Sequence, residues 1–277
     1  MKEIEILKAL TSKEILDKVS DSSINKAGGS FKTIFLLAIL AGAYIAIGGF
    51  ASTMASYNLT SDPATFGLGR LVSGCVFPVG LMMVVLCGAE LFTGNCLMVT
   101  GVADKKIKFG GMFRNWAIVY IGNLIGAVIF AYFVFYTDCL DASNGLLGAM
   151  TIKTAVAKVN LDFGKAVVLG IMCNWLVCLA VWLVTGAQST VSKIFGCFFI
   201  ILPFVIGGFE HCVANMYFIP AGMMAATNEA YVNVLGLDVS SLTVGAFVLK
   251  NLLPVTIGNI IGGSGFVGMM YWVIHRK

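Results

Sequence analysis

The sequence predicts an all-α integral membrane protein with six transmembrane helices, arranged as two inverted halves of three spans each. Of the 277 residues, 58% are hydrophobic and 12% are charged, and the mean hydropathy is +0.92. Six apolar segments are each long enough to cross a bilayer. The second and fifth of these segments contain matching polar motifs, which indicates an internal repeat and two interrupted helices.

This composition excludes a soluble enzyme fold. The formal charge of +4 is spread over loops, so no nucleic-acid partner is expected. Seven of the eight cysteines lie within or beside apolar segments and only Cys139 lies clearly in a loop, which argues against a disulfide framework. Residues 1–32 carry six lysines and five acidic residues without an apolar core, so we expect no cleavable signal peptide.

Residues 1–30 are predicted to form an amphipathic helix on the cytoplasmic side, ahead of a single six-helix transmembrane domain at residues 31–277. Apolar residues recur there at roughly helical spacing among lysines: Ile4, Leu7, Leu10, Ile15, Leu16 and Val19. We expect this helix to lie along the membrane surface.

The six spans follow in order, with repeats at about residues 31–136 and 165–274. They are predicted at about Phe31–Ser56, Gly67–Asp104 with a break at Gly88–Asn95, Phe113–Tyr136, Val167–Thr185, Ile194–Met224 with a break at Gly207–Asn215, and Val244–Ile274. Six crossings place both termini on one side. That side receives 13 lysines and arginines and the other side 5, so the positive-inside rule places both termini in the cytoplasm of a cell membrane.

The internal repeat rests on two ordered matches. The spacing of Gly88, Glu90 and Asn95 recurs 120 residues later at Gly208, Glu210 and Asn215. The sequence Arg114-Asn115 followed by Gly122-Asn123 recurs 136 residues later as Lys250-Asn251 followed by Gly258-Asn259. Because each half has an odd number of spans, the second half runs inverted and the two breaks approach each other within the membrane.

Polar residues of the repeat have predicted structural roles. Glu90 and Glu210 are expected to accept hydrogen bonds from loop backbone amides, since a carboxylate facing an anion path would repel the anion. The repeat asparagines Asn95 and Asn215, together with Asn115, are expected to order the same loops. Asn174 and Asn259 could tie helix ends together or reach a substrate path.

His211 lies in the second break, inside an otherwise apolar run. An ionised side chain at this depth costs several kcal/mol, so such residues usually face a cavity. A neutral imidazole there could donate a hydrogen bond to a weak-acid anion and exchange a proton with it. The alternative is a histidine that only bonds a neighbouring helix, and the glycines beside the break favour function.

Four sequence blocks resemble the signature blocks of the formate/nitrite transporter family. They are G-A-E-L-F-T-G-N, N-W-L-V-C-L-A-V-W, G-F-E-H-C-V-A-N-M and P-V-T-I-G-N-I-I-G-G. The resemblance extends from about Gly42 to the C-terminus. It implies an aquaporin-like protomer, a homopentamer with one substrate path through each protomer, and small anions or their conjugate acids as cargo.

The resemblance also implies roles for individual residues. It makes His211 the central pore histidine, with Thr93 of the opposite break as its hydrogen-bonding companion. It places Lys158 near the outer end of the path, where its charge would concentrate anions. Apolar constrictions on either side of the histidine are implied at Leu81, Leu91, Phe77 and Phe204.

We therefore expect a pH-dependent channel or transporter for small weak-acid anions, formate first, with nitrite and hydrosulfide as alternatives. No cofactor or metal is expected. An intramembrane enzyme is disfavoured because the chain has only two histidines, His211 and His275, and no H-E-x-x-H motif. A water or glycerol channel is disfavoured because paired Asn-Pro-Ala loops are missing from the sequence.

Overall fold

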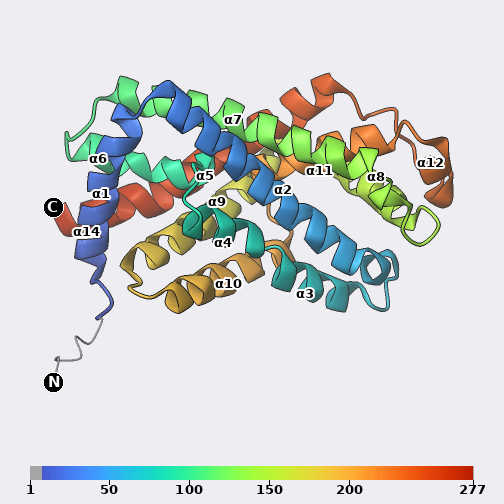
Figure 1. The fold of residues 1–277 in the computed structure, drawn as a ribbon, viewed down its shortest axis with the longest axis horizontal. Helices are drawn as coiled ribbons and strands as arrows, with labels where there is room; N and C mark the ends of the chain where they lie inside the picture. The colour runs from blue at the N-terminus through green and yellow to red at the C-terminus, as the bar shows by residue number, and fades with distance from the viewer. Residues whose placement is uncertain (1–7, 277) are drawn as a thin grey trace.

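The computed structural model describes residues 8–276, and all regular structure within them is helical (Figure 1). Six helical segments are long and apolar enough to cross a membrane. They are α2 (Phe31–Ser61), α3 with α4 (Phe66–Val76 and Val79–Leu86), α7 (Phe109–Tyr136), α9 (Phe163–Gly186), α10 (Thr190–Gly207) and the continuous segment Ala246–Arg276. The predicted all-α fold with six spans is confirmed, with helix ends up to five residues from the expected ones.

The last span changes its helical form along its length. It comprises η3 (Ala246–Leu252), α13 (Leu253–Ile260), η4 (Ile261–Met269) and α14 (Met270–Arg276), of which η3 and η4 are π-helical. Helices α1 (Ser12–Gly28) and α14 lie at the same end of the bundle, which we call the terminal end (Figure 1). The opposite end, which we call the distal end, carries α8 (Leu146–Val159) and α12 (Glu229–Leu235).

Both predicted helix breaks are present. The first follows α4 at Gly88, and the chain resumes as α5 (Phe92–Asn95), η1 (Cys96–Met98) and α6 (Val99–Ala103). The second follows α10 at Gly208, and the chain resumes as α11 (Cys212–Ala225). Gly88 and Gly208 have φ of +75° and +72°, a conformation that glycine adopts without the penalty a Cβ would bring.

The two breaks are anchored by equivalent hydrogen bonds. The Asn123 side chain accepts from Phe92 N–H and donates to Glu90 O, and the Asn259 side chain accepts from Cys212 N–H and donates to Glu210 O. These bonds satisfy backbone groups that a broken helix would otherwise leave unpaired away from water. The asparagines recur at the offset of 136 and their backbone partners at the offset of 120, in agreement with the two offsets of the internal repeat. The inverted orientation of the second half stays a prediction.

Glycines let the helices within each half approach closely. A Cβ on Gly126 of α7 would lie 1.9 Å from Ile39 O of α2, and a Cβ on Gly258 of α13 would lie 2.1 Å from Val167 O of α9. Small residues at such contacts are the usual way in which membrane helices pack tightly. The α2–α7 and α9–α13 pairs thus form the rigid frame around the breaks.

The N-terminal helix α1 (Ser12–Gly28) crosses the terminal end of the bundle (Figure 1). Its apolar residues Ile15, Leu16 and Val19 are buried in the main core of the protein. The bundle itself covers this apolar face, and the position of α1 along the membrane surface stays a prediction. The expectation for Ile4 and Leu7 lies outside the described residues.

Two helices at the distal end, α8 and α12, lie outside the predicted spans. Helix α8 buries Leu147 and Ile152, and these pack with Tyr231 of α12 in a second apolar cluster. Only one face of α8 is buried, and the polar residues on its other face make the segment resemble a loop in the sequence. Helix α8 also carries Lys158 in its last turn, so it positions one of the candidate site residues.

Candidate permeation site

Two cavities enter the bundle from opposite ends and share no lining residue. The distal vestibule has a volume of about 370 Å³, and its lining includes Arg70, Lys153, Lys158, Glu210 and His211. The terminal vestibule has a volume of about 390 Å³, and its lining includes Lys26, Glu90 and Asn95. His211 lines the distal vestibule, and its role on a path through the protein stays a prediction.

The four predicted constriction residues line the inner parts of these vestibules. Phe77 and Phe204 line the distal vestibule, with their ring centroids 5.4 Å apart in an edge-to-face arrangement of 83°. Leu81 and Leu91 line the terminal vestibule. All four side chains are at least 96% buried. They separate the two water-accessible spaces with apolar surface.

His211 and Thr93 meet between the two vestibules. His211 Nε2 lies 2.9 Å from Thr93 Oγ1, and both residues are buried. Thr93 lies in α5 and His211 is the N-cap of α11, so this contact joins the two helix breaks. The Phe204 ring lies beside the imidazole at a centroid distance of 6.1 Å.

The hydrogen bonds determine the tautomer of His211. Nδ1 accepts the backbone N–H of Ala214 at 3.0 Å and so carries no proton itself. In the neutral imidazole the proton is then on Nε2, which donates to Thr93 Oγ1. The Thr93 hydroxyl keeps its own proton, which it can donate to a passing molecule.

Buried neighbours hold Thr93 in place. Asn174 Nδ2 and Cys178 Sγ–H each donate to the Thr93 carbonyl at 3.2 Å. Asn174 also donates to Asn259 O at 2.7 Å. The predicted path residues Asn174 and Asn259 line neither vestibule, and their amide nitrogens bond to backbone carbonyls. Both asparagines therefore tie helix segments together, and their direct contact with cargo stays a prediction.

Glu210 belongs to a buried network on the distal side of the breaks. Lys158 Nζ lies 2.7 Å from Glu210 Oε1, and Asn215 Nδ2 donates to Glu210 Oε2 at 2.6 Å. Asn215 also donates to Asn251 Oδ1, and Asn251 in turn donates to Lys158 O. Lys158 thus lies in the distal vestibule beside the break, and its predicted place near the outer end of the path stays a prediction.

An equivalent network lies on the terminal side. Lys26 Nζ lies 2.7 Å from Glu90 Oε1, Asn95 Nδ2 donates to Glu90 Oε2 at 2.6 Å, and Asn95 also donates to Asn115 Oδ1. Asn115 then donates to Lys26 O. The networks differ in three contacts. Lys26 also donates to Glu90 Oε2 and to Asn95 Oδ1, whereas Lys158 bonds only Glu210 Oε1 and Asn215 Oδ1 is buried without a partner among residues 8–276. Asn251 in turn donates to Glu210 Oε2 at 3.3 Å, a bond that Asn115 does not make to Glu90 within those residues.

These networks correct one expectation. The side chains of Glu90 and Glu210 bond to lysine and asparagine side chains and not to loop backbone amides. A carboxylate at this depth is stabilised by a direct positive partner together with further hydrogen bonds. The asparagines Asn95, Asn215 and Asn115 order the breaks through the same carboxylates.

Sequence reasoning missed four residues of the site. Asn123 and Asn251 lie within the repeated motifs, so the repeat itself could have identified them. Lys26 lies outside both motifs, in a helix assigned to the membrane surface, and nothing in its local sequence links it to Glu90. Arg70 lines the distal vestibule and carried no motif.

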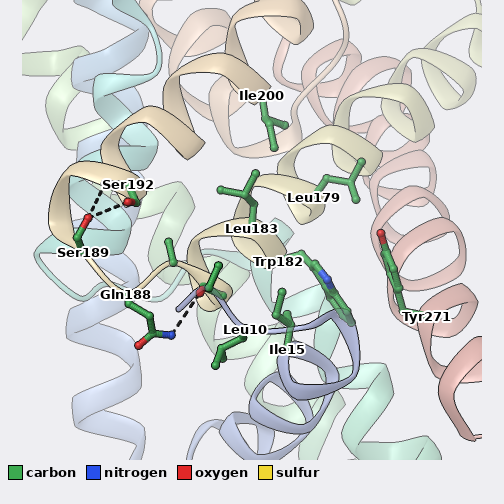
Figure 2. Close-up of a pocket in the computed structure, with 13 residues that line it drawn as sticks. Leu10, Ile15, Leu179, Trp182, Leu183, Gln188, Ser189, Ser192, Ile200 and Tyr271 are labelled. Carbon is green, nitrogen blue, oxygen red and sulfur yellow. Dashed lines mark hydrogen bonds between the residues drawn. The ribbon is translucent and has the colours of Figure 1, made fainter. Parts of the chain in front are cut away.

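A third cavity lies at the terminal end, away from this site (Figure 2). It has a volume of about 520 Å³ and lies between the start of α1, the end of α9 and the first part of α10. Trp182 and Tyr271 form one of its walls. None of the predicted site residues lines it. Within residues 8–276, no group of three or more His, Cys, Asp or Glu side chains could hold a metal ion.

Six apolar spans, two interrupted helices and two opposed vestibules that approach a buried histidine define a multi-pass membrane transport protein. The sequence profile of the family described as "Formate/nitrite transporter" matches residues 13–273, and the chain belongs to that family.

Two relatives match most of the chain. It is 42% identical over 258 residues to a probable formate transporter of Methanothermobacter thermautotrophicus, covering 88% of this chain and 89% of that protein. It is 41% identical over 248 residues to formate channel FocA of Escherichia coli (strain K12), covering 88% of this chain and 86% of that protein.

Solved structures agree with the fold. A pentameric formate channel with formate bound superposes with a TM-score of 0.79 at 35% identity, covering 89% of this chain and 98% of that one. An FNT family ion channel superposes with a TM-score of 0.81 at 27% identity, covering 94% and 98%.

Proposed function

We propose that the chain conducts formate and closely related small weak acids across a membrane, through a path that runs from one vestibule past Thr93 and His211 to the other. The observation that carries this proposal is the buried contact between Thr93 Oγ1 and His211 Nε2, at 2.9 Å, between two vestibules that each contain a lysine. Relatives named as formate channels support formate as the cargo.

The chemistry of the path favours entry as an anion and passage as an acid. Arg70, Lys153 and Lys158 line the distal vestibule against one carboxylate, Glu210, and this net positive charge raises the local concentration of anions. In the terminal vestibule Glu90 offsets the charge of Lys26. The apolar layers at Phe77, Phe204, Leu81 and Leu91 make a bare charge costly, by several kcal/mol in a membrane interior. Protonation removes that cost, so transport carries a proton with each carboxylate and rises as pH falls.

At the centre, the Thr93 hydroxyl is the donor that meets the carbonyl oxygen of the acid. His211 holds this hydroxyl by donating from Nε2, and its Nδ1 accepts Ala214 N–H. A second proton on His211 at low pH must displace the Ala214 N–H and loosen the first turn of α11. We propose that this displacement is the origin of pH-dependent switching.

The assembled form is proposed to be a homopentamer with a path through each protomer, both termini in the cytoplasm and the N-terminal helix on that side. The pentameric state of a formate channel that superposes on this chain supports the assembly. A native mass of five times the 29.4 kDa chain mass would be expected, and a monomer in mild detergent would contradict it.

The function is tested by stopped-flow flux measurements in proteoliposomes. Formate, nitrite and hydrosulfide are compared across a pH series with protein-free vesicles as the control. We expect formate flux to exceed the control and to rise with acidification. Formate flux equal to that of empty vesicles at every pH would overturn the proposal, and faster nitrite or hydrosulfide flux would reassign the cargo.

A further inference from the structure

One arginine connects the two interrupted helices at the distal vestibule. Arg70 lies near the start of α3 and lines this vestibule. Its Nε and Nη2 donate to Ile206 O at 3.1 Å and 2.9 Å, and Nη2 also donates to Val205 O. Both carbonyls belong to the last turn of α10, immediately before the break.

Ile206 O needs a partner from outside the helix, whereas Val205 O also accepts the N–H of Gly208. The last turn of a helix leaves carbonyl groups without intrahelical donors. Ile206 O would normally accept from the N–H of Glu210, but that N–H donates to Leu169 O of α9. The planar guanidinium supplies several donors in one fork, and its positive charge suits the negative end of a helix.

The same face of α3 leads from Arg70 to the distal constriction. Arg70, Gly74 and Phe77 are spaced at i, i+4 and i+7, and therefore share one helical face. A Cβ on Gly74 would lie 2.9 Å from Ile206 Cγ1 and 3.1 Å from Leu202 O, so α3 and α10 touch closely there. Further inward, Phe77 and Phe204 form the edge-to-face pair.

We propose that Arg70 is a positioning residue that controls the width of the distal constriction. By fastening the end of α10 to α3, it holds the Phe77 and Phe204 rings against each other. It thereby limits the size of the acid that passes. This inference rests on the proposed function, and it makes Arg70 a determinant of selectivity among monocarboxylates rather than only a positive charge at the entrance.

The two roles are separated by Arg70→Lys, Arg70→Gln and the matched control Lys153→Gln. Lys153 is an exposed cation that lines the same vestibule, so its replacement removes charge without touching α10. Permeabilities of formate, acetate and lactate are measured in proteoliposomes at low and high ionic strength, because salt screens a purely electrostatic effect.

We expect R70Q to raise the acetate-to-formate and lactate-to-formate ratios several-fold at both ionic strengths. R70K should raise both ratios less, because a single ammonium group replaces only some of the hydrogen bonds that the guanidinium donates to α10. K153Q should keep the wild-type ratios and lower formate entry at low salt alone. Wild-type ratios in R70K, together with an R70Q that behaves like K153Q, would overturn the positioning role.

A structural measurement tests the positioning role of Arg70 independently of flux. In a cryo-EM structure of R70Q we expect the Phe77–Phe204 centroid separation to exceed the 5.4 Å of the wild type. An unchanged separation would overturn the inference. If R70Q does not assemble, R70K serves in both measurements. A wild-type protein without weak-acid flux would contradict the proposed function, while the ring separation would still test the role of Arg70.

Discussion

His211 Nε2 and Thr93 Oγ1 lie 2.9 Å apart and form the one side-chain hydrogen bond within residues 8–276 that joins the two helix breaks directly. The contact makes Thr93, and not the imidazole, the group whose proton is free to face the path. It also makes the hydrogen bond at Nδ1 the one that protonation of the histidine must disrupt.

Replacing Thr93 by Val should lower formate flux at every pH, because the isosteric side chain keeps the shape and removes the hydroxyl donor. A neutral hydrogen bond of about 1 kcal/mol corresponds to a decrease of roughly fivefold. Stopped-flow flux in proteoliposomes is the measurement. Thr93→Ser is the matched control and should retain most of the flux. Equal rates for T93V and T93S would remove the hydroxyl from the mechanism.

Replacing His211 by Phe should abolish pH-dependent switching, since no group at that position could then be protonated and displace Ala214 N–H. Flux is compared across a pH series with the wild type in the same vesicles. The neutral permeant acid still becomes more abundant at low pH, so the test compares permeability per neutral acid molecule. If that quantity has the same pH profile in H211F and wild type, the histidine is not the switch.

Replacing Lys158 by Met should destabilise the protein by about 3–5 kcal/mol, because it leaves the Glu210 carboxylate buried without its positive partner. Thermal unfolding in detergent measures this loss. Lys158→Met with Glu210→Gln should recover part of the stability, because no buried carboxylate is then left without a positive partner. Lys153→Met is the control and should unfold like the wild type.

Replacing Gly262 by Ala should disrupt packing, whereas Gly265→Ala in the same span should be tolerated. A Cβ on Gly262 would lie 2.3 Å from Ile171 O of α9, whereas a Cβ on Gly265 meets no atom within 4 Å. Overpacking of this kind costs about 1–3 kcal/mol or more. Thermal stability of the two purified variants compares them. Similar stabilities would contradict the close α9–η4 contact.

Asp104 joins the N-terminal helix to the C-terminal one at the terminal end. Burial favours its neutral form, but hydrogen bonds from Arg276, Ser20 and Trp272 outweigh burial and hold its pKa well below the usual 3.8. Lys106 adds a positive charge at 3.8 Å. The Arg276 hydrogen bond likewise lowers the pKa of Asp17, in α1.

A carboxylate with a lowered folded-state pKa contributes stability above its unfolded pKa and loses that contribution as pH falls. Asp104→Asn should therefore lower the thermal stability by a constant amount at pH 5 to 8, and the difference from wild type should shrink below about pH 4. Melting temperatures across pH provide the measurement. A difference that grows on acidification would contradict the assigned sign.

Much of the candidate site could be read from residue type and spacing. The Glu90–Asn95 and Glu210–Asn215 motifs located both breaks, because glycine followed by polar residues in an apolar run rarely forms an uninterrupted membrane helix. The partners of those carboxylates could not be found in this way. Lys26 and Lys158 lie 64 and 52 residues from Glu90 and Glu210 along the chain, and no local pattern records that distance.

The all-helical membrane fold, the six spans and the two breaks follow from the amino-acid sequence, since bilayer thickness and the need to satisfy backbone hydrogen bonds leave few alternatives for such apolar segments. Three features are visible only in the folded protein: which lysine pairs with which carboxylate, the burial of the apolar face of α1 against the bundle, and the bonds by which Arg70 joins α3 to α10. These contacts depend on how helices distant in the chain pack in three dimensions, which hydropathy and periodicity do not encode.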